Sequence, residues 1–242
     1  MARTLEVLRN DAWELLDGFV SDQEKGMPPP PLQKVPPGEI PDVALPSCDE
    51  LGGMALRQAI ERRRSRRKYS AAPLSAAELS FLLWATQGVQ KVFREGMAAF
   101  RTVPSGGARH PFETVLVVRN VSGVGPGRYR YMPLQHGLRL ECPAPSREEV
   151  SAACAGQDFV ATAPVVFLWT AVPYRTEWRY GPAAAKLMAL DAGHVCQNLY
   201  LAAESLGLGT CAVGAYIQDA ADRVAGVDGS SEAVVYIAPV GR

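Results

Sequence analysis

Seven consecutive residues, from Arg62 to Lys68, carry the strongest chemical signal in this chain, because six of them are cationic and the seventh, Ser65, bears a hydroxyl. Elsewhere the charges balance: 25 Lys and Arg residues offset 25 Asp and Glu residues, and the formal net charge is zero. Guanidinium groups bind phosphate oxygens two at a time, and a hydroxyl adds a further donor. A protein that follows nucleic acid carries a basic excess, which is missing here. The run therefore predicts a site for a small phosphate-bearing ligand and no nucleic-acid partner.

A second candidate site lies in residues 101–111, where two adjacent glycines are enclosed by prolines just before an apolar run. Glycine has no side chain, so the backbone there approaches a flat ligand closely. A serine and an arginine in the same segment add hydrogen-bond donors. The same spacing also fits a tight turn into the following strand, and the residues alone leave both interpretations open. The residues expected at a ligand are Pro104, Ser105, Gly106, Gly107 and Arg109.

Two further segments contain residues that could bind a ligand. Gly207, Gly209 and Gly214 superficially resemble a dinucleotide-binding fingerprint. They follow a predicted helix rather than a strand, and the third glycine is misplaced, so we reject that mode of binding. The chain ends in Gly241-Arg242 directly after an apolar run. A terminal arginine usually frays, but one that follows a buried strand can be fixed in place.

The composition limits the class of protein. A chain of 242 residues fits one large domain or two small ones, and an apolar fraction of 48% supplies a core. No apolar run reaches the ~18 residues that span a bilayer, and the segment from Met1 to Leu5 contains no apolar signal-peptide region. The five cysteines form no CxxC pair and the three histidines are far apart, so we expect neither a disulfide framework nor a metal site. We expect a cytoplasmic protein with no membrane partner.

Residues 1–50 are expected to form an N-terminal helix and a proline-rich arm, ahead of a domain at residues 51–242. The helix is predicted over residues 4–20 from a partial apolar face made of Leu5, Leu8, Trp13, Leu16 and Val20. Prolines then recur from Pro28 to Pro46, which predicts an extended arm of polyproline character. The arm is either a disordered tail or a segment that packs on the domain or on a second subunit.

The remainder of the chain mixes helices with strands. Ser75 with Glu78, and Ser146 with Glu149, are capping-box pairs that each mark the start of a helix. Because hairpins coexist with long helices and no βαβ repeat occurs, we predict an α+β fold. Strands are predicted at residues 112–119, 129–131, 138–140, 164–171 and 233–240, and further helices at residues 54–63 and 182–206.

These segments together resemble the nitroreductase-like flavoproteins, and most closely their SagB-type dehydrogenase branch. The resemblance implies the nitroreductase fold, in which a central, mainly antiparallel sheet is flanked by helices. It also implies an obligate homodimer with FMN bound at the subunit interface. It covers about residues 55–242, and its motifs follow the family's order: Arg63-Arg64-Ser65-x-Arg67-x-Tyr69, Leu83 to Gly88, Arg101 to Pro111, Gly207 to Tyr216, and Gly241-Arg242.

The resemblance implies a role in FMN binding for each segment. The family's element that holds the FMN phosphate and ribityl chain matches Arg63, Arg64, Ser65 and Arg67. The terminal cation that returns to the phosphate matches Arg242. The segment that lies near the flavin ring matches residues 101–111. The loop whose backbone amides face flavin N5 matches residues 207–216, with Val213, Gly214 and Ala215 at its centre.

The implied activity is that of an FMN-dependent oxidoreductase. In such enzymes a hydride passes through flavin N5, here between NAD(P)H or an organic donor and an unidentified acceptor. The substrate is a small molecule or a peptide. Two alternatives remain open: an enzyme that cleaves reduced FMN with oxygen, and a non-catalytic flavin-binding scaffold in a peptide-modification complex.

One departure from the branch concerns residues 177–180. Family members that oxidise azolines in peptide natural products carry a Lys-Tyr pair implicated in catalysis, and the nearest match here is Arg179-Tyr180. Arginine is a poor proton acceptor, so azole formation is not expected. Tyr180 is the group there that can exchange a proton, and it is our candidate catalytic residue, facing substrate rather than binding FMN. Trp178 is expected to pack beside the flavin.

Overall fold

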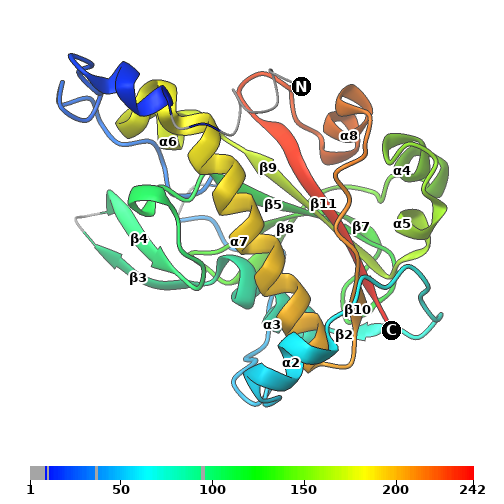
Figure 1. Cartoon of the computed structure of the whole chain (residues 1–242). Coiled ribbons are helices and arrows are strands. Elements are labelled where there is room, and N and C mark those ends of the chain that lie inside the picture. Colours follow the sequence, from blue (N-terminus) through cyan, green and yellow to red (C-terminus); the bar gives the residue numbers. More distant parts are fainter. Residues whose placement is uncertain (1–8, 10, 36–37, 94–95) are drawn as a thin grey trace.

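The computed structural model describes residues 9, 11–35, 38–93 and 96–242. Its centre is a seven-stranded sheet in the order β1-β8-β7-β5-β9-β11-β10, in which every neighbouring pair is antiparallel. Helices lie on both sides of this sheet (Figure 1). The prediction of an α+β fold with an antiparallel sheet flanked by helices is confirmed. The strands of the sheet are β1 (Val43–Ala44), β5 (Phe112–Val118), β7 (Gly127–Met132), β8 (Gly137–Cys142), β9 (Val165–Ala171), β10 (Gly209–Thr210) and β11 (Ala233–Gly241).

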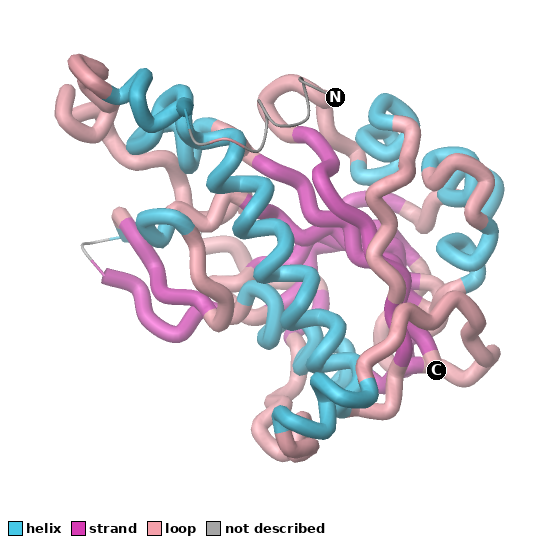
Figure 2. Tube along the Cα trace, viewed as in Figure 1, coloured by secondary structure: helices cyan, strands magenta, loops and turns pink. Residues whose placement is uncertain are grey.

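Strand β5 shows why the sheet separates two cores. All of its residues are buried, and successive side chains of a strand point to opposite faces. Leu116 packs into one core together with α3 and α7, whereas Val115 packs into a second core with α4, α5 and α8. Figure 2 shows the sheet between these two sets of helices. The helices are α3 (Ala76–Gln87), α4 (Arg147–Ala153), α5 (Asp158–Thr162), α7 (Ala184–Ser205) and α8 (Gln218–Ala225).

Two helices begin at the capping boxes predicted from the sequence. Before α3, the Ser75 hydroxyl accepts the Glu78 backbone N–H at 3.1 Å, and the Glu78 carboxylate accepts the Ser75 backbone N–H at 2.8 Å. Ser146 and Glu149 form the same pair of hydrogen bonds before α4. Each cap stabilises its helix by about 1 kcal/mol. The shorter α2 (Leu56–Arg62) precedes them and carries no side-chain cap.

The long central helix is also confirmed. A 3-10 turn, η4 (Gly181–Ala183), precedes α7 and has Pro182 in its first turn, where a missing backbone N–H costs nothing. Val195 and Leu199 of α7 are buried against the sheet, whereas Leu190 is 54% exposed. The helix therefore crosses the sheet with one side in the core and another side open (Figure 1).

Several elements were not predicted from the sequence. A hairpin of β3 (Val89–Phe93) and β4 (Ala98–Arg101) stands apart from the main sheet. Helix α6 (Tyr174–Tyr180) precedes η4, and a short turn, η3 (Gly106–Ala108), follows the hairpin. A small parallel pair joins β2 (Leu74–Ser75) to β6 (Val121–Ser122). Within the described ranges, no helix is long and apolar enough to cross a membrane.

The predicted helix over residues 4–20 is wrong in its described part. The chain forms only a short 3-10 helix there, η1 (Asp11–Leu16). Gly18 has a φ of +73°, a left-handed conformation that ends a right-handed helix. Residues 1–8 and 10, which include Leu5 and Leu8, lie outside the described residues.

The described part of the proline-rich arm packs on the domain and is not a free tail. The Trp178 indole N–H donates to the Met27 carbonyl at 3.0 Å. The Lys34 ammonium lies 2.6 Å from the carboxylate of Glu232, whose side chain is 1% exposed. Further along, β1 pairs with β8 at the edge of the sheet. Pro36 and Pro37 lie outside the described residues, and the division of the chain at residue 50 stays a prediction.

Candidate functional site

The arginine run leaves α2 and continues as an extended segment beside β10. Arg63 is the C-cap of α2, and Ser65 forms a parallel bridge with Thr210. The Arg66 backbone N–H donates to the Thr210 carbonyl at 2.9 Å. The Arg64 guanidinium donates to backbone carbonyls, including that of Arg63 at 2.8 Å. The backbone of the run is therefore fixed against the strand that follows α7.

The structure divides the arginines of the run into two kinds. Arg66 forms an ion pair with the buried Glu204 at 3.1 Å. Arg63 lies over the ring of Tyr200 at 5.3 Å, and Arg67 over the ring of Phe159 at 5.9 Å. Neither of these two has a carboxylate partner among the described residues. Arg66 occupies the unspecified position of the sequence motif, so the neutralised arginine is the one that the motif leaves out.

Tyr200 of α7 joins the arginine run to the loop that follows β10. Its hydroxyl hydrogen-bonds with the Ser65 hydroxyl at 2.9 Å and accepts the Ala212 backbone N–H at 2.8 Å. One side chain thus connects two of the segments that the sequence assigned to the same ligand. Tyr200 was not predicted from the sequence, because a tyrosine in the middle of an amphipathic helix gives no signal of its own.

The loop of residues 211–216 presents backbone amides beside an apolar cavity of about 560 Å³. The Val213 N–H already donates to the Ile237 carbonyl at 2.8 Å. In the part of the chain that the structure describes, the N–H groups of Gly214 and Ala215 have no backbone acceptor. These two amides therefore remain able to bind a ligand. Small residues and an aromatic ring wall the cavity, among them Ala185, Ala189, Ala192, Gly193, Gly214 and Tyr236.

Arg242 is anchored close to the arginine run, but its charge is paired. The Ser70 backbone N–H donates to the Arg242 carbonyl at 2.6 Å. The Arg242 guanidinium forms an ion pair with Glu78 of α3. The structure therefore brings the C-terminus beside the segment that contains the motif, with the terminal guanidinium directed to Glu78. A role at a phosphate requires the ligand to compete with this carboxylate.

Asp191 of α7 holds the glycine-bearing loop of residues 104–110. The Ser105 hydroxyl donates to Asp191 Oδ2 at 2.6 Å, and the Gly106 N–H lies 3.2 Å from both carboxylate oxygens. Ser105 Oγ also accepts the His110 N–H at 2.9 Å. Burial raises the pKa of Asp191, and the hydrogen bonds from Ser105 and Gly106 act in the opposite direction. The sequence did not reveal Asp191, whose partner Ser105 lies 86 positions earlier.

Tyr180, the candidate catalytic residue, lies against the same loop. A Cβ atom on Gly107 would be 2.6 Å from the Tyr180 hydroxyl oxygen. Gly107 has a φ of +58°, a conformation that favours glycine, so this close approach depends on the residue type. The Arg179 guanidinium lies over the Tyr180 ring at 5.4 Å. The structure thus brings together the tyrosine and the loop that we expect near the flavin ring.

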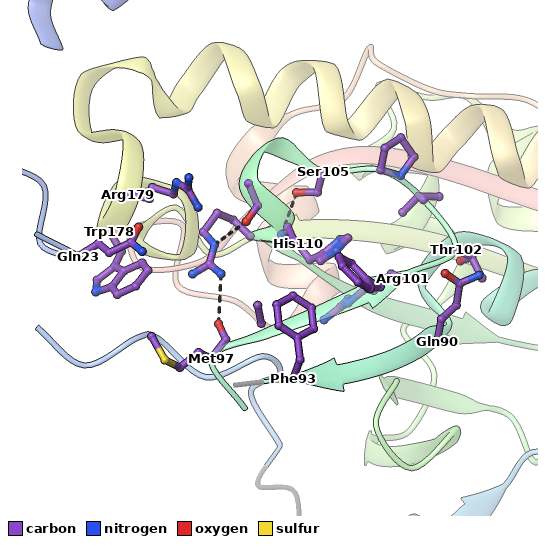
Figure 3. A pocket seen from close by; sticks show the side chains of 17 residues that line it. Gln23, Gln90, Phe93, Met97, Arg101, Thr102, Ser105, His110, Trp178 and Arg179 are labelled. Atoms are coloured by element: carbon purple, nitrogen blue, oxygen red, sulfur yellow. Dashed lines mark hydrogen bonds between the residues drawn. The ribbon is translucent and has the colours of Figure 1, made fainter. Parts of the chain in front are cut away.

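A second cavity, of about 670 Å³, opens between this loop, the β3–β4 hairpin and α6. Pro104, Ser105 and Gly107 line it from the loop. Trp178 is 2% exposed and lies at one end of the cavity (Figure 3). The Arg109 guanidinium covers the Trp178 ring at 5.1 Å. Trp178 therefore packs beside the predicted flavin-ring loop.

The two parts of the predicted site lie on opposite sides of α7. The loop of residues 104–110 contacts Asp191, and the arginine run contacts Tyr200. Asp191 and Tyr200 are nine residues apart, which corresponds to a rotation of about 180° and a rise of about 13 Å along an α-helix. Within one chain, the two groups of candidate residues therefore face away from each other across the helix.

Residues 60–242 match the Nitroreductase family. Because this match spans most of the chain, the protein belongs to the nitroreductase family, and the predicted resemblance to the nitroreductases is confirmed. The family places the chain among the oxidoreductases. The protein MJ1384 of Methanocaldococcus jannaschii, whose name assigns it to the nitroreductases, is 36% identical over 205 residues. That alignment covers 85% of this chain and 98% of MJ1384.

Two other proteins are similar to this chain. TfxB, a trifolitoxin-processing protein of Rhizobium leguminosarum bv. trifolii, is 34% identical over 113 residues, which is 45% of this chain and 30% of TfxB. A nitroreductase-type structure from Desulfovibrio desulfuricans, in complex with FMN, has a TM-score of 0.54 and 20% identity. That likeness covers 78% of this chain and 86% of the other, and at this identity it shows the fold alone.

Proposed function

We propose that this protein is an FMN-dependent oxidoreductase of the SagB-type branch, which passes a hydride through flavin N5 between NAD(P)H or another organic donor and an acceptor. One observation carries the proposal: Tyr200 joins the arginine run to the loop that offers the Gly214 and Ala215 amides. Bound FMN supplies the redox chemistry, and the protein supplies binding, orientation and hydrogen bonds.

The residues fit FMN at three points. Arg63 and Arg67, which have no carboxylate partner among the described residues, suit a phosphate. The apolar cavity beside the 211–216 loop suits a flat ring system. Ala192, which lines that cavity, lies within about 80° of Tyr200 around α7. The regions for phosphate and ring therefore share one side of the helix.

Under this proposal each protein group has a limited task. Arg63, Arg64, Ser65 and Arg67 bind the phosphate and ribityl chain through charge-assisted hydrogen bonds. The Gly214 and Ala215 amides donate hydrogen bonds to the ring and so favour the reduced, more electron-rich form. Tyr180 faces the substrate and gives or takes a proton there.

A second copy of the chain completes the proposed site. The loop of residues 104–109 lies on the far side of α7 from Tyr200, so it does not reach the same ring within one chain. In a homodimer, the loop of one protomer contacts the FMN held by its partner. The open apolar surface of α7, with Leu190 54% exposed, supports pairing along this helix. The loop residues that would contact the partner's flavin are Pro104, Ser105, Gly106, Gly107 and Arg109.

The proposal is tested by the flavin itself. The purified protein should be yellow, and heat denaturation should release FMN rather than FAD. Arg67→Ala should weaken FMN binding about tenfold or more, because a hydrogen bond to a charged group is worth roughly 1.5–3 kcal/mol. Arg57→Gln, which changes an exposed arginine of α2 that is paired with Glu61, should leave the FMN affinity unchanged.

One result would count against this function, and another against the placement of the phosphate. A colourless protein that takes up no FMN on incubation ends the proposal. An unchanged FMN affinity in Arg67→Ala moves the phosphate away from the arginine run and leaves the family assignment untouched.

The similarity to TfxB favours a second candidate function, a flavin-binding component of a peptide-modification complex. Arg179 stands where azoline oxidases keep a lysine, so this candidate is a scaffold rather than an azole-forming enzyme. Reduction of the bound FMN by NADH or NADPH separates the two, because a non-catalytic scaffold leaves its flavin oxidised.

A further inference from the structure

The 670 Å³ cavity beside the flavin-ring loop has the size of a site for a small organic molecule. Its walls come from four parts of the chain. Phe93 and Phe100 belong to the β3–β4 hairpin, and Trp178 and Arg179 to α6. The loop of residues 102–110 forms the third wall, and Gln23 of the N-terminal segment forms the fourth.

The charges that line this cavity are all of one sign. Arg101, Arg109 and Arg179 line it, and none of the described lining residues is acidic. Figure 3 shows Arg179 and Arg101 entering from different elements, α6 and the hairpin. Three guanidinium groups, with no carboxylate among the described lining residues, favour an anionic occupant.

Arg101 is a buried cation at this cavity, and its charge is only partly compensated. It is 6% exposed, and its hydrogen bonds go to neutral acceptors, the Gln87 amide oxygen at 2.6 Å and the Leu32 carbonyl at 2.7 Å. Its Nε is buried without a partner among the described residues. Glu113 is the acidic group that acts on Arg101, but its carboxylate bonds to Arg175 at 2.5 Å. A buried cation is stable only when a counter-charge or strong hydrogen bonds compensate for lost hydration.

Aromatic rings supply flat surfaces next to these cations. The rings of Phe93 and Phe100 lie 4.6 Å apart, and Phe100 is 53% exposed. On the far side, Trp178 carries the Arg109 guanidinium on its face at 5.1 Å. Stacked guanidinium and indole groups present a platform for a planar ligand. The cavity therefore combines a positive lining with flat apolar walls.

The N-terminal segment holds this arrangement in place. The Met27 carbonyl accepts the Trp178 indole N–H at 3.0 Å, and the Gln23 backbone N–H donates to the Trp178 carbonyl at 3.0 Å. Leu32 accepts from Arg101. All three segment residues precede residues 60–242, the part that matches the family. This wall is thus added to the family domain by the preceding segment.

We propose that this cavity is the substrate subsite and that it takes a small planar organic carboxylate, such as an aromatic acid. The carboxylate meets the arginine lining, and the planar body lies against the aromatic walls. This assignment rests on the proposed function, because it takes the ligand to be the molecule that exchanges a hydride with FMN. It goes beyond that function in naming the charge and shape of the substrate.

The test compares two probes that differ in charge, 4-nitrobenzoate and its neutral amide 4-nitrobenzamide, by calorimetric titration of the purified protein. We expect the carboxylate to bind about tenfold tighter than the amide, because hydrogen bonds to charged groups exceed those to neutral groups by that order. Arg101→Gln should abolish the preference. If that variant does not fold, Arg179→Gln tests the proposal instead. Its affinity for the carboxylate should fall about threefold, as expected for an exposed charge, and its affinity for the amide should not change.

Two controls sharpen this comparison. Arg179→Lys keeps the charge and should keep most of the preference. Arg223→Gln changes an exposed arginine of α8, outside the cavity, and should change nothing. Equal affinity for both probes in protein that contains FMN overturns the substrate class and leaves the proposed function standing. Protein without FMN that still prefers the carboxylate overturns the proposed function and supports the anion site.

Discussion

Acid should destabilise this protein through His110, a buried histidine at the end of the loop that lines the proposed substrate cavity. Its side chain is 4% exposed. Burial is the main cause that lowers its pKa from 6.5 to about 3, and the charges of Arg101, Arg109 and Arg175 lower it further. A hydrogen bond with the Ala99 backbone acts in the opposite direction. The imidazole is therefore neutral in the folded protein well below its ordinary pKa.

The sign and size of the effect follow from proton linkage. Below about pH 6.5 the unfolded chain binds a proton on this residue that the folded chain does not bind until about pH 3. The stabilisation is therefore complete above the unfolded pKa and is lost as the pH falls towards the folded pKa. The slope is about 1.4 kcal/mol per pH unit in this window, so the loss between about pH 7.5 and about pH 5 is about 2 kcal/mol.

Urea denaturation across this pH range measures the effect. The matched variant is His110→Asn, because His110 has a φ of +46° and asparagine tolerates that left-handed conformation. The variant removes one titrating group, so its free energy of unfolding should depend less steeply on pH, by about 1.4 kcal/mol per unit between about pH 6 and about pH 4. Parallel pH profiles for the two proteins would refute the reasoning, whatever the offset between them.

Two further substitutions test the site and the assembly. Tyr180→Phe should leave FMN occupancy intact and lower turnover modestly in a steady-state assay. A loss of turnover of about 10²–10⁴-fold would establish Tyr180 as a general acid or base. A loss of bound FMN would show that Tyr180 does not face the substrate. If the chain forms the proposed homodimer along α7, Leu190→Glu should convert it to a monomer in light scattering. The variant should also lose FMN, because the proposed flavin site needs both chains. Leu140→Glu, at a residue of β8 that is 46% exposed, should change neither property. A flavin-loaded monomer would contradict the shared site.

The parts of the fold that depend on local interactions were predictable from the sequence. The capping boxes at Ser75 and Ser146 join a side chain to a backbone three residues away, so the sequence pattern contains the whole interaction. Strands β5 and β9 are apolar on both faces because helices cover both sides of the sheet, and a continuous apolar run is the sequence signal of such a strand.

Elements that depend on distant partners were not predictable. Arg175 of α6 is buried because it pairs with Glu113, 62 positions earlier. From the sequence alone, a short segment with such charges indicates an exposed loop rather than a packed helix. The β3–β4 hairpin was missed for another reason, since its connection lacks the Asn-Gly or Asp-Gly pair that marks tight hairpins.

The candidate site divides in the same way. The motif indicated which cations to consider, but the pairing of Arg66 with Glu204 and the anchoring of Ser105 by Asp191 are contacts across 138 and 86 positions. Both partners are acidic residues on a helix, where a carboxylate most often faces solvent. Their burial depends on the packing of the loop and the arginine run against α7, which no local sequence pattern indicates.

The geometry of α7 also explains why the order of the motifs along the sequence does not show whether one chain or two form the site. Asp191 and Tyr200 are close in sequence, and each fixes one part of the predicted flavin site. At 3.6 residues per turn, their spacing turns the two parts to opposite sides of the helix. A ligand held by the arginine run is therefore screened by α7 from its own chain's loop. If both parts bind one flavin, we expect the second part to come from another copy of the chain, because α7 separates the two parts within one chain. The proposed site therefore predicts a dimer.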